Sequence, residues 1–110
     1  METYLITGGA DSVGGHLAEY LLEKGHAVHC VDNTLASDSL DRIGHLLSQP
    51  QFRFVEGRVE DREVLEGAAR GCCGIFHVAH VGLAATSAVL RFAAEHSMPV
   101  MITSSGASLN

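Results

Sequence analysis

Apolar residues in this chain follow two patterns, short unbroken runs and longer stretches in which apolar positions recur at helical spacing. A short apolar run is typical of a strand buried on both faces of a parallel sheet, and the helical spacing is typical of a helix packed on one side. The predicted strands are residues 4–6, 27–31, 52–55, 74–80 and 99–102, where residues 74–80 include the exit of the fourth strand. The predicted helices are residues 13–24, 38–48, 61–70 and 83–96. This alternation predicts an α/β fold.

Capping residues set the ends of three of the predicted helices. Gly25 follows the first helix, at the position where a C-cap needs left-handed backbone. Asp61 can cap the third helix at its N-terminus. In the second predicted helix, Leu40, Ile43 and Leu47 lie on one face, Ser37 or Asp38 can cap the N-terminus, and Pro50 ends the helix.

The chain has 110 residues, 46% of them apolar, and a net charge of −6. This length and composition fit one small globular domain. Positive charge is not clustered, so no nucleic-acid partner is expected, and no apolar run approaches the ~20 residues that cross a membrane. The N-terminus has no basic leader, and the cysteines, Cys30, Cys72 and Cys73, form an odd set. We therefore expect no signal peptide, no disulfide framework and a cytoplasmic location.

The candidate chemistry is concentrated between the first strand and the first helix, from Thr7 to Gly14 (TGGADSVG). A helix N-terminus carries a partial positive charge, and glycines let a phosphate approach the backbone closely. Strand, glycine-rich turn and helix are typical of a dinucleotide-binding βαβ unit. Asp32 and Asn33 end the second strand about 20 residues past the turn, where an acidic side chain accepts hydrogen bonds from ribose hydroxyls of NAD and repels the 2′-phosphate of NADP.

The glycine segment resembles the TGGAGFIG motif of the extended short-chain dehydrogenases/reductases, the NAD-dependent epimerase/dehydratase family. The three spaced glycines of that family fall on Gly8, Asp11 and Gly14, so a carboxylate replaces the middle glycine. One like-charge contact at about 4 Å costs roughly 1–4 kcal/mol, so we expect Asp11 to weaken cofactor binding by about one to three orders of magnitude. Residues 31–33 and 40–47 are similar to nucleotide-sugar epimerases and UDP-glucuronate decarboxylases within the family.

The resemblance implies cofactor-binding positions along the chain. Arg58 stands where the family has an aspartate that accepts a hydrogen bond from the adenine amino group, and a guanidinium has only donors. Val59 and Ala79 match the family, whereas His80 replaces a smaller alanine on the nicotinamide-ribose side. The residues implied to bind NAD are Gly8, Asp11, Ser12, Val13, Gly14, Asp32, Asn33, Arg58, Val59, Ala79 and His80.

The resemblance also implies a catalytic position, Ser105, after the last predicted strand. In the family this serine positions a substrate hydroxyl, while a tyrosine assisted by a lysine transfers a proton beside the nicotinamide. Here Leu109 stands at the tyrosine position, and the chain's tyrosines and lysine are Tyr4, Tyr20 and Lys24. A family loop after the fourth strand also has no counterpart. We therefore do not expect hydride transfer by this chain alone.

Four residues near the fourth strand have side chains of the types that zinc prefers as ligands; they are Cys72, Cys73, His77 and His80. Adjacent cysteines do not have the spacing of a zinc knuckle. The two histidines differ in strand parity and would point to opposite faces. We therefore interpret these residues as core or loop residues and predict no metal site.

The predicted fold class is α/β, a Rossmann-like, doubly wound parallel sheet of five strands in the order 3-2-1-4-5. It forms a single truncated domain over residues 1–110, an NAD(P)-binding domain that lacks the family's C-terminal substrate-binding part. Three functions stay open. The chain is the cofactor-binding half of an epimerase/dehydratase-type enzyme acting on a nucleotide-sugar, a non-catalytic nucleotide- or partner-binding module with a degraded NAD site, or a truncated product whose open sheet edge needs a partner such as a second copy.

Overall fold

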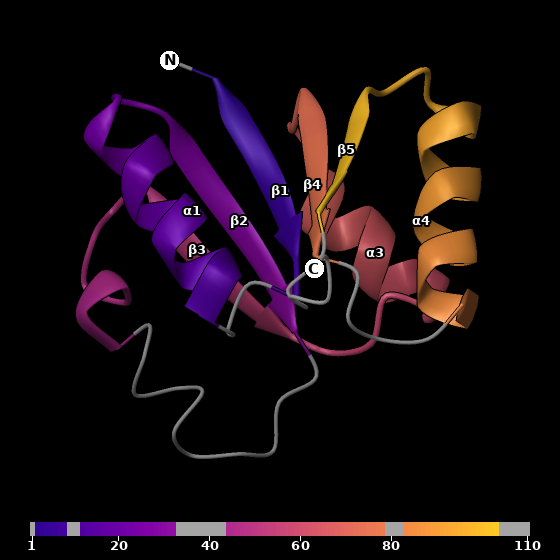
Figure 1. Cartoon of the computed structure of the whole chain (residues 1–110), viewed down its shortest axis with the longest axis horizontal. Helices are drawn as coiled ribbons and strands as arrows, with labels where there is room; N and C mark the ends of the chain where they lie inside the picture. The colour runs from indigo at the N-terminus through magenta and orange to yellow at the C-terminus, as the bar shows by residue number, and fades with distance from the viewer. Residues whose placement is uncertain (1, 9–11, 33–43, 79–82, 104–110) are drawn as a thin grey trace, which may run out of the picture.

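The computed structural model of the chain describes residues 2–8, 12–32, 44–78 and 83–103. Within these residues, strands and helices alternate along the chain (Figure 1). The strands are β1 (Thr3–Thr7), β2 (Ala27–Asp32), β3 (Phe52–Glu56), β4 (Gly74–Val78) and β5 (Val100–Thr103). The helices are α1 (Ser12–Glu23), the short 3₁₀ helix η1 (Gly44–Leu46), α3 (Arg62–Ala69) and α4 (Leu83–Glu95).

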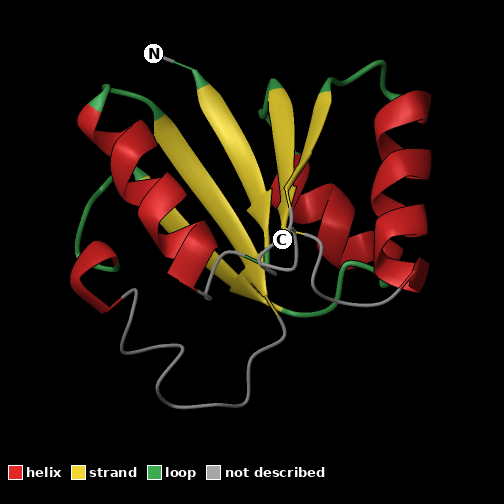
Figure 2. Ribbon diagram, viewed as in Figure 1, coloured by secondary structure: helices red, strands yellow, loops and turns green. Residues whose placement is uncertain are grey.

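The strands form one parallel sheet in the order β3-β2-β1-β4-β5, which confirms the predicted fold class. The α1 helix packs on one face of the sheet, and α3 and α4 pack on the other (Figure 2). Parallel neighbours must enter the sheet from the same end, so each connection has to return over a face. The strand order reverses between β1 and β4, and the carboxyl ends of the strands there leave room for a site.

Alternation along each strand divides the apolar residues into two layers. In β1, Leu5 belongs to the layer with α3 and α4, whereas Ile6 belongs to the layer with α1. In β2, Val31 and Cys30 are divided between the layers in the same way. Successive side chains of a strand point to opposite faces, so one unbroken apolar run fills both layers. This is the physical reason why short apolar runs predicted the strands.

The capping residues predicted for the first and third helices act as caps in the structure. Gly25 has a φ of 90°, and its amide donates to the carbonyl of Leu22 at 3.0 Å, so the chain leaves α1 through a left-handed glycine. The side chain of Asp61 accepts a hydrogen bond of 3.1 Å from the amide of Glu63 in the first turn of α3. Both helix ends are therefore specified by local sequence.

The second predicted helix, residues 38–48, is wrong in the part that the structure describes. There the chain forms only the 3₁₀ turn η1 and then bends toward β3. Leu46 is buried, at 1% exposed, whereas Leu47, which the prediction placed on the apolar face of the helix, is 50% exposed. Pro50 disfavours helical backbone at the residue before it, and the amide of Leu47 donates to a carbonyl only three residues back. Residues 37–43 of that prediction lie outside the described residues.

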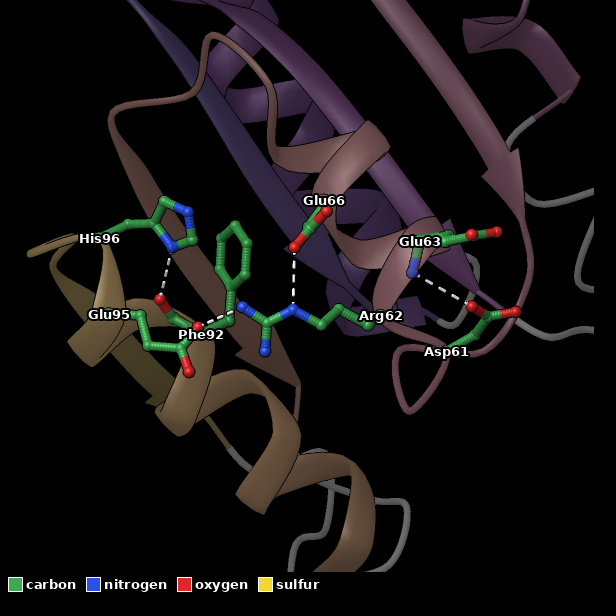
Figure 3. A network of polar contacts seen from close by, with 7 residues as sticks. All are labelled: Asp61, Arg62, Glu63, Glu66, Phe92, Glu95 and His96. Carbon is green, nitrogen blue, oxygen red and sulfur yellow. Dashed lines mark hydrogen bonds and ion pairs between the residues drawn. The ribbon is translucent and has the colours of Figure 1, made fainter.

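A polar network on the surface joins α3 to α4 (Figure 3). The Nε of Arg62 donates to Oε2 of Glu66 at 2.8 Å, one helical turn further on, and its Nη2 donates to Oε1 of Glu95 in α4. The hydrogen bond from Arg62 is the main reason why the pKa of Glu95 lies below its ordinary value. Nearby, the rings of Phe92 and His96 stack with their centroids 4.1 Å apart. The network ties together the two helices on this face of the sheet.

The β5 strand stands at the end of the sheet order and carries exposed apolar side chains. Met101 is 58% exposed and Ile102 is 47% exposed. On the α1 side of the sheet, Tyr4, Phe76 and Met101 help to line an apolar hollow of about 210 Å³. The part of the sheet around β5 is therefore less covered than the part around β1 and β2.

Candidate functional site

A cavity of about 300 Å³ opens at the carboxyl ends of the strands, where the strand order reverses. Its wall comes from the ends of β1, β2 and β4, from the segment after β3 and from the start of α4. The lining residues are Thr7, Gly8, Val31, Asp32, Gly57, Arg58, Val59, Glu60, His77, Val78 and Ala85. This is the usual place for a ligand in an open α/β sheet.

The turn after β1 forms one end of the cavity. Gly8 has a φ of 79°, a left-handed conformation that glycine adopts without steric penalty. Its amide donates to the carbonyl of Val31 in β2 at 2.8 Å, which holds the turn against the sheet. The α1 helix begins shortly afterwards, at Ser12, so its N-terminus faces the same edge (Figure 1). A helix N-terminus at this position favours an anion.

The segments after β2 and β3 form the other end of the cavity. The carbonyl of Asp32 accepts a hydrogen bond of 3.0 Å from the amide of Gly57, which joins the two strand ends. Val59 is buried, and the Nη2 of Arg58 lies 3.4 Å from Oε2 of Glu60. This end therefore combines an apolar wall, Asp32 and an exposed pair of opposite charges.

Four of the residues predicted to bind a cofactor line this one cavity; they are Gly8, Asp32, Arg58 and Val59. Three others belong to the start of α1, which holds Ser12, Val13 and the buried Gly14. The remaining predicted site residues, Asp11, Asn33, Ala79, His80 and Ser105, lie outside the described residues.

Sequence reasoning missed a buried polar relay on the cavity wall. His77 in β4 lies opposite Thr7 in β1, and its Nδ1 is 2.5 Å from the Oγ1 of Thr7. Its Nε2 is 2.9 Å from the Oγ1 of Thr86 in α4. A neutral imidazole donates through one nitrogen and accepts through the other, so the ring ties the start of α4 to the centre of the sheet. The sequence signal for this relay is one polar residue near the carboxyl end of each of two apolar strands.

The cysteine and histidine side chains considered as zinc ligands make other contacts where the structure describes them. The Sγ of Cys72 lies 3.5 Å from Nδ1 of His29 and 3.6 Å from the carbonyl oxygen of Ala68, while His77 belongs to the relay. Among the described residues, no group of three or more His, Cys, Asp or Glu side chains is placed to hold a metal ion. In the same residues no helix has the length and apolar character that crossing a membrane requires.

A parallel sheet in this order, with a glycine turn and a strand-ending aspartate at one cavity, has the architecture of the dinucleotide-binding class of α/β domains. Comparison with known families makes the assignment specific. The family model described as GDP-mannose 4,6 dehydratase matches residues 5–105. The chain therefore belongs to the NAD-dependent epimerase/dehydratase family, the extended short-chain dehydrogenases/reductases.

Two solved structures and one curated relative show the extent of the likeness. The dTDP-glucose 4,6-dehydratase of Bacillus anthracis, solved in complex with NAD, matches 94% of this chain with a TM-score of 0.80 and 19% identity. The UDP-glucose 4-epimerase of Bifidobacterium longum, solved with NAD+ and UDP, matches 94% with a TM-score of 0.77 and 25% identity. The 3 beta-hydroxysteroid dehydrogenase/Delta 5-->4-isomerase of Mycobacterium tuberculosis is 37% identical over 78 residues, or 70% of this chain.

The chain is much shorter than the proteins it resembles. It spans 19% of the Mycobacterium tuberculosis relative and 37% of each of the two solved chains. The names of these three relatives give different substrates, two of them nucleotide-sugars and one a steroid. The comparisons therefore establish the family and the fold of this chain.

Proposed function

We propose that residues 1–110 are a dinucleotide-binding domain whose ligand is NAD, bound in the cavity at the carboxyl ends of β1, β2 and β3. The turn at Gly8 and the start of α1 face the pyrophosphate, and Asp32 accepts hydrogen bonds from ribose hydroxyls. The observation that carries the proposal is that Gly8, Asp32 and Val59, which are distant in sequence, line one cavity of about 300 Å³.

The residues on the cavity suit this ligand in shape and charge. The left-handed turn at Gly8 brings backbone rather than a side chain to the pyrophosphate end. At the other end, the buried Val59 offers an apolar contact for a base. The family relatives solved with NAD support the same choice of ligand. The resemblance adds Asp11, Ser12, Val13, Gly14, Asn33, Arg58, Ala79 and His80 as proposed contacts.

For the whole protein we propose an NAD-dependent epimerase- or dehydratase-type reaction on a nucleotide-sugar. The matching family model and the two sugar-nucleotide enzymes among the named relatives support this substrate class. NAD, when bound, supplies a hydride acceptor. This chain contributes the binding cavity and Ser105, the proposed positioning group for a substrate hydroxyl. The tyrosine–lysine pair that the resemblance requires is not among these residues, so the reaction needs that pair from a further segment or a partner.

A second candidate function is partner binding without catalysis. The observation that favours it is the exposed apolar surface at β5, where Met101 and Ile102 are 58% and 47% exposed. An edge strand with such side chains is suited to pairing with another chain. The partner in this candidate is a second copy of the chain.

Calorimetric titration of NAD into the chain and into the Asp11→Gly variant tests the proposal. We expect weak binding by the unchanged chain and binding about tenfold tighter or more in the variant. The substitution removes the negatively charged Asp11 carboxylate, which would repel the negatively charged pyrophosphate. Asp32→Asn in the Asp11→Gly background tests the proposed contact of Asp32 with the ribose hydroxyls. It keeps the shape of the side chain but removes its charge, so affinity should fall again by about tenfold.

The outcomes separate the two candidates. Micromolar binding by the unchanged chain supports the NAD proposal and means that the Asp11 carboxylate points away from the pyrophosphate. If neither folded protein binds NAD, the proposal is overturned. A concentration-dependent dimer in size-exclusion chromatography then supports the partner-binding candidate, and a clean monomer counts against it.

A further inference from the structure

The cavity extends to both sides of the glycine turn, because β1 stands between β2 and β4 in the sheet. On the β2 side its wall includes Asp32, and on the β4 side it includes Val78 of β4 and Ala85 of α4. In the proposed binding mode one ribose lies at Asp32 and the pyrophosphate lies at Gly8. The second nucleoside of a dinucleotide then extends across the strand-order reversal to the β4 side. The ends of β4 and α4 therefore border the space for the nicotinamide half of NAD.

His77 connects the parts of the wall on the β4 side. Its Nδ1 atom lies 2.5 Å from Oγ1 of Thr7, the residue before the glycine turn. Its Nε2 atom lies 2.9 Å from Oγ1 of Thr86 in the first turn of α4. His77 is only 1% exposed, so these contacts are made inside the protein. One rigid ring therefore sets the spacing between the end of β1 and the start of α4.

We propose that His77 is a positioning residue for the nicotinamide half of the cavity, acting through Thr7 and Thr86; the inference rests on the proposed binding of NAD. A neutral imidazole donates through one nitrogen and accepts through the other, and a threonine hydroxyl can do either. Both contacts are therefore satisfied at the same time. Loss of one contact lets α4 shift relative to the glycine turn. Because Ala85 lines the cavity beside Thr86, such a shift changes the width of the β4 side.

Thr86 is the place to test this role, because its hydroxyl acts at a distance from the ligand. Thr86 is half-buried and, among the described residues, is not part of the cavity wall. The relay of Thr7, His77 and Thr86 also lies away from Asp32, which is on the other side of β1. A change at Thr86 should therefore affect a ligand that reaches the β4 side and spare one that occupies only the β2 side and the glycine turn.

The test compares NAD with ADP in the Asp11→Gly chain by calorimetric titration. ADP has the adenosine and the two phosphates of NAD and lacks the nicotinamide nucleoside. Thr86→Val keeps the branched shape of the side chain and removes its hydroxyl. We expect this variant to bind NAD about threefold to tenfold more weakly and to bind ADP with an affinity within about twofold of the parent.

Two further variants serve as controls. Thr86→Ser keeps the hydroxyl, so its affinity for NAD should stay within about twofold of the parent. Ser87→Ala removes a hydroxyl from the next residue of α4, which is exposed and outside the cavity wall, and should change neither affinity. NMR of the imidazole nitrogens is a second readout. The His77 signals should shift when NAD is added to the Asp11→Gly chain and should not shift when ADP is added.

The outcomes separate a positioning role from a structural one. Equal weakening of NAD and ADP binding in the folded Thr86→Val variant assigns the hydroxyl to stability of the whole fold and overturns the inference. Unchanged affinity for both ligands also overturns it. In either case the NAD-binding proposal stands. If neither ligand binds the folded Asp11→Gly chain, the NAD-binding proposal fails and the inference fails with it.

Discussion

The Oγ1 atom of Thr7 and the Nδ1 atom of His77 lie 2.5 Å apart across two central strands, and each residue is only 1% exposed. The two residues are 70 positions apart in sequence and are brought together by the register of β1 with β4. A buried polar group without its partner loses hydrogen bonds that water would otherwise supply. The pair therefore makes this register specific as well as stable.

Replacing His77 with Phe should lower the free energy of unfolding by about 1–3 kcal/mol, because the Thr7 hydroxyl then stays buried without the ring nitrogen. Urea denaturation followed by circular dichroism measures the loss. Adding Thr7→Val to this variant should recover part of it, since both polar partners are then gone. Strict additivity of the two substitutions would contradict the pairing.

Gly57→Ala should destabilise the fold by about 1–3 kcal/mol through overpacking. A Cβ atom at Gly57 would lie 2.9 Å from Cγ1 of Val64 in α3, and a β-branched side chain has little freedom to move away. Gly67→Ala is the matched control, because a Cβ atom there meets nothing within 4 Å and the residue lies within α3. That control should be neutral or stabilising by helix propensity. Equal urea midpoints for the two variants would count against the close contact at Gly57.

Arg62→Gln should lower the urea midpoint at neutral pH in low salt, and the effect should shrink on acidification. The substitution removes the hydrogen bonds from Arg62 to Glu66 and Glu95 that join α3 to α4 (Figure 3). Glu66→Gln is the control, because it weakens only the contact within α3 and leaves the link to Glu95. Denaturation curves at neutral pH and near pH 3 measure the difference.

The sign of this pH dependence follows from the pKa of Glu95. Arg62 holds that pKa below its ordinary value of 4.5 in the folded protein. A carboxyl group with a depressed folded pKa contributes stability that is complete above its ordinary pKa and is lost as the pH falls through the folded pKa. The gap between the unchanged chain and Arg62→Gln should therefore close toward low pH. A gap that stays constant or widens would show that the pair is not the cause.

The three cysteines should react with iodoacetamide in a fixed order at pH 8. Cys73 is exposed and should react first, whereas burial raises the pKa of the Cys72 thiol to about 11. Relative to the ordinary pKa of 9.0, the Cys72 thiolate is then roughly a hundredfold scarcer. Cys30 is buried in the core, which also raises the pKa of its thiol, so it should react only after unfolding. Peptide mass spectrometry follows each site, and Cys73→Ser should remove the fast phase.

Local signals in the sequence were sufficient to predict the sheet. The apolar runs around Leu5, Val31 and Ile75 became strands because buried parallel strands need apolar residues on both faces. Gly8 and Asp32 were found because the turn and the strand end have distinctive chemistry, and the structure places both on one cavity.

Features that depend on distant contacts were not predictable in the same way. The helical spacing of residues 38–48 placed Leu47 on an apolar helix face, but the chain forms a 3₁₀ turn before Pro50 that buries Leu46 and leaves Leu47 exposed. The relay through His77 depends on strand register and on the position of α4, and neither is encoded by neighbouring residues. The ion pair of Arg58 with Glu60 likewise lines the cavity only because the segment after β3 lies next to the end of β2, and neighbouring residues do not encode that arrangement.

The β1 strand is first in the chain and central in the sheet, so its two neighbours are synthesised at different times. Translation at ~5–20 residues per second takes roughly 2–9 s to pass from the start of β2 to the start of β4. During this interval one edge of β1 lacks its final neighbour, and Leu5 lacks the contacts that Ile75 and α4 later provide. Pairing of distant parallel strands is also intrinsically slow. A nascent chain of this topology therefore presents an open central strand to chaperones until its C-terminal half has been made.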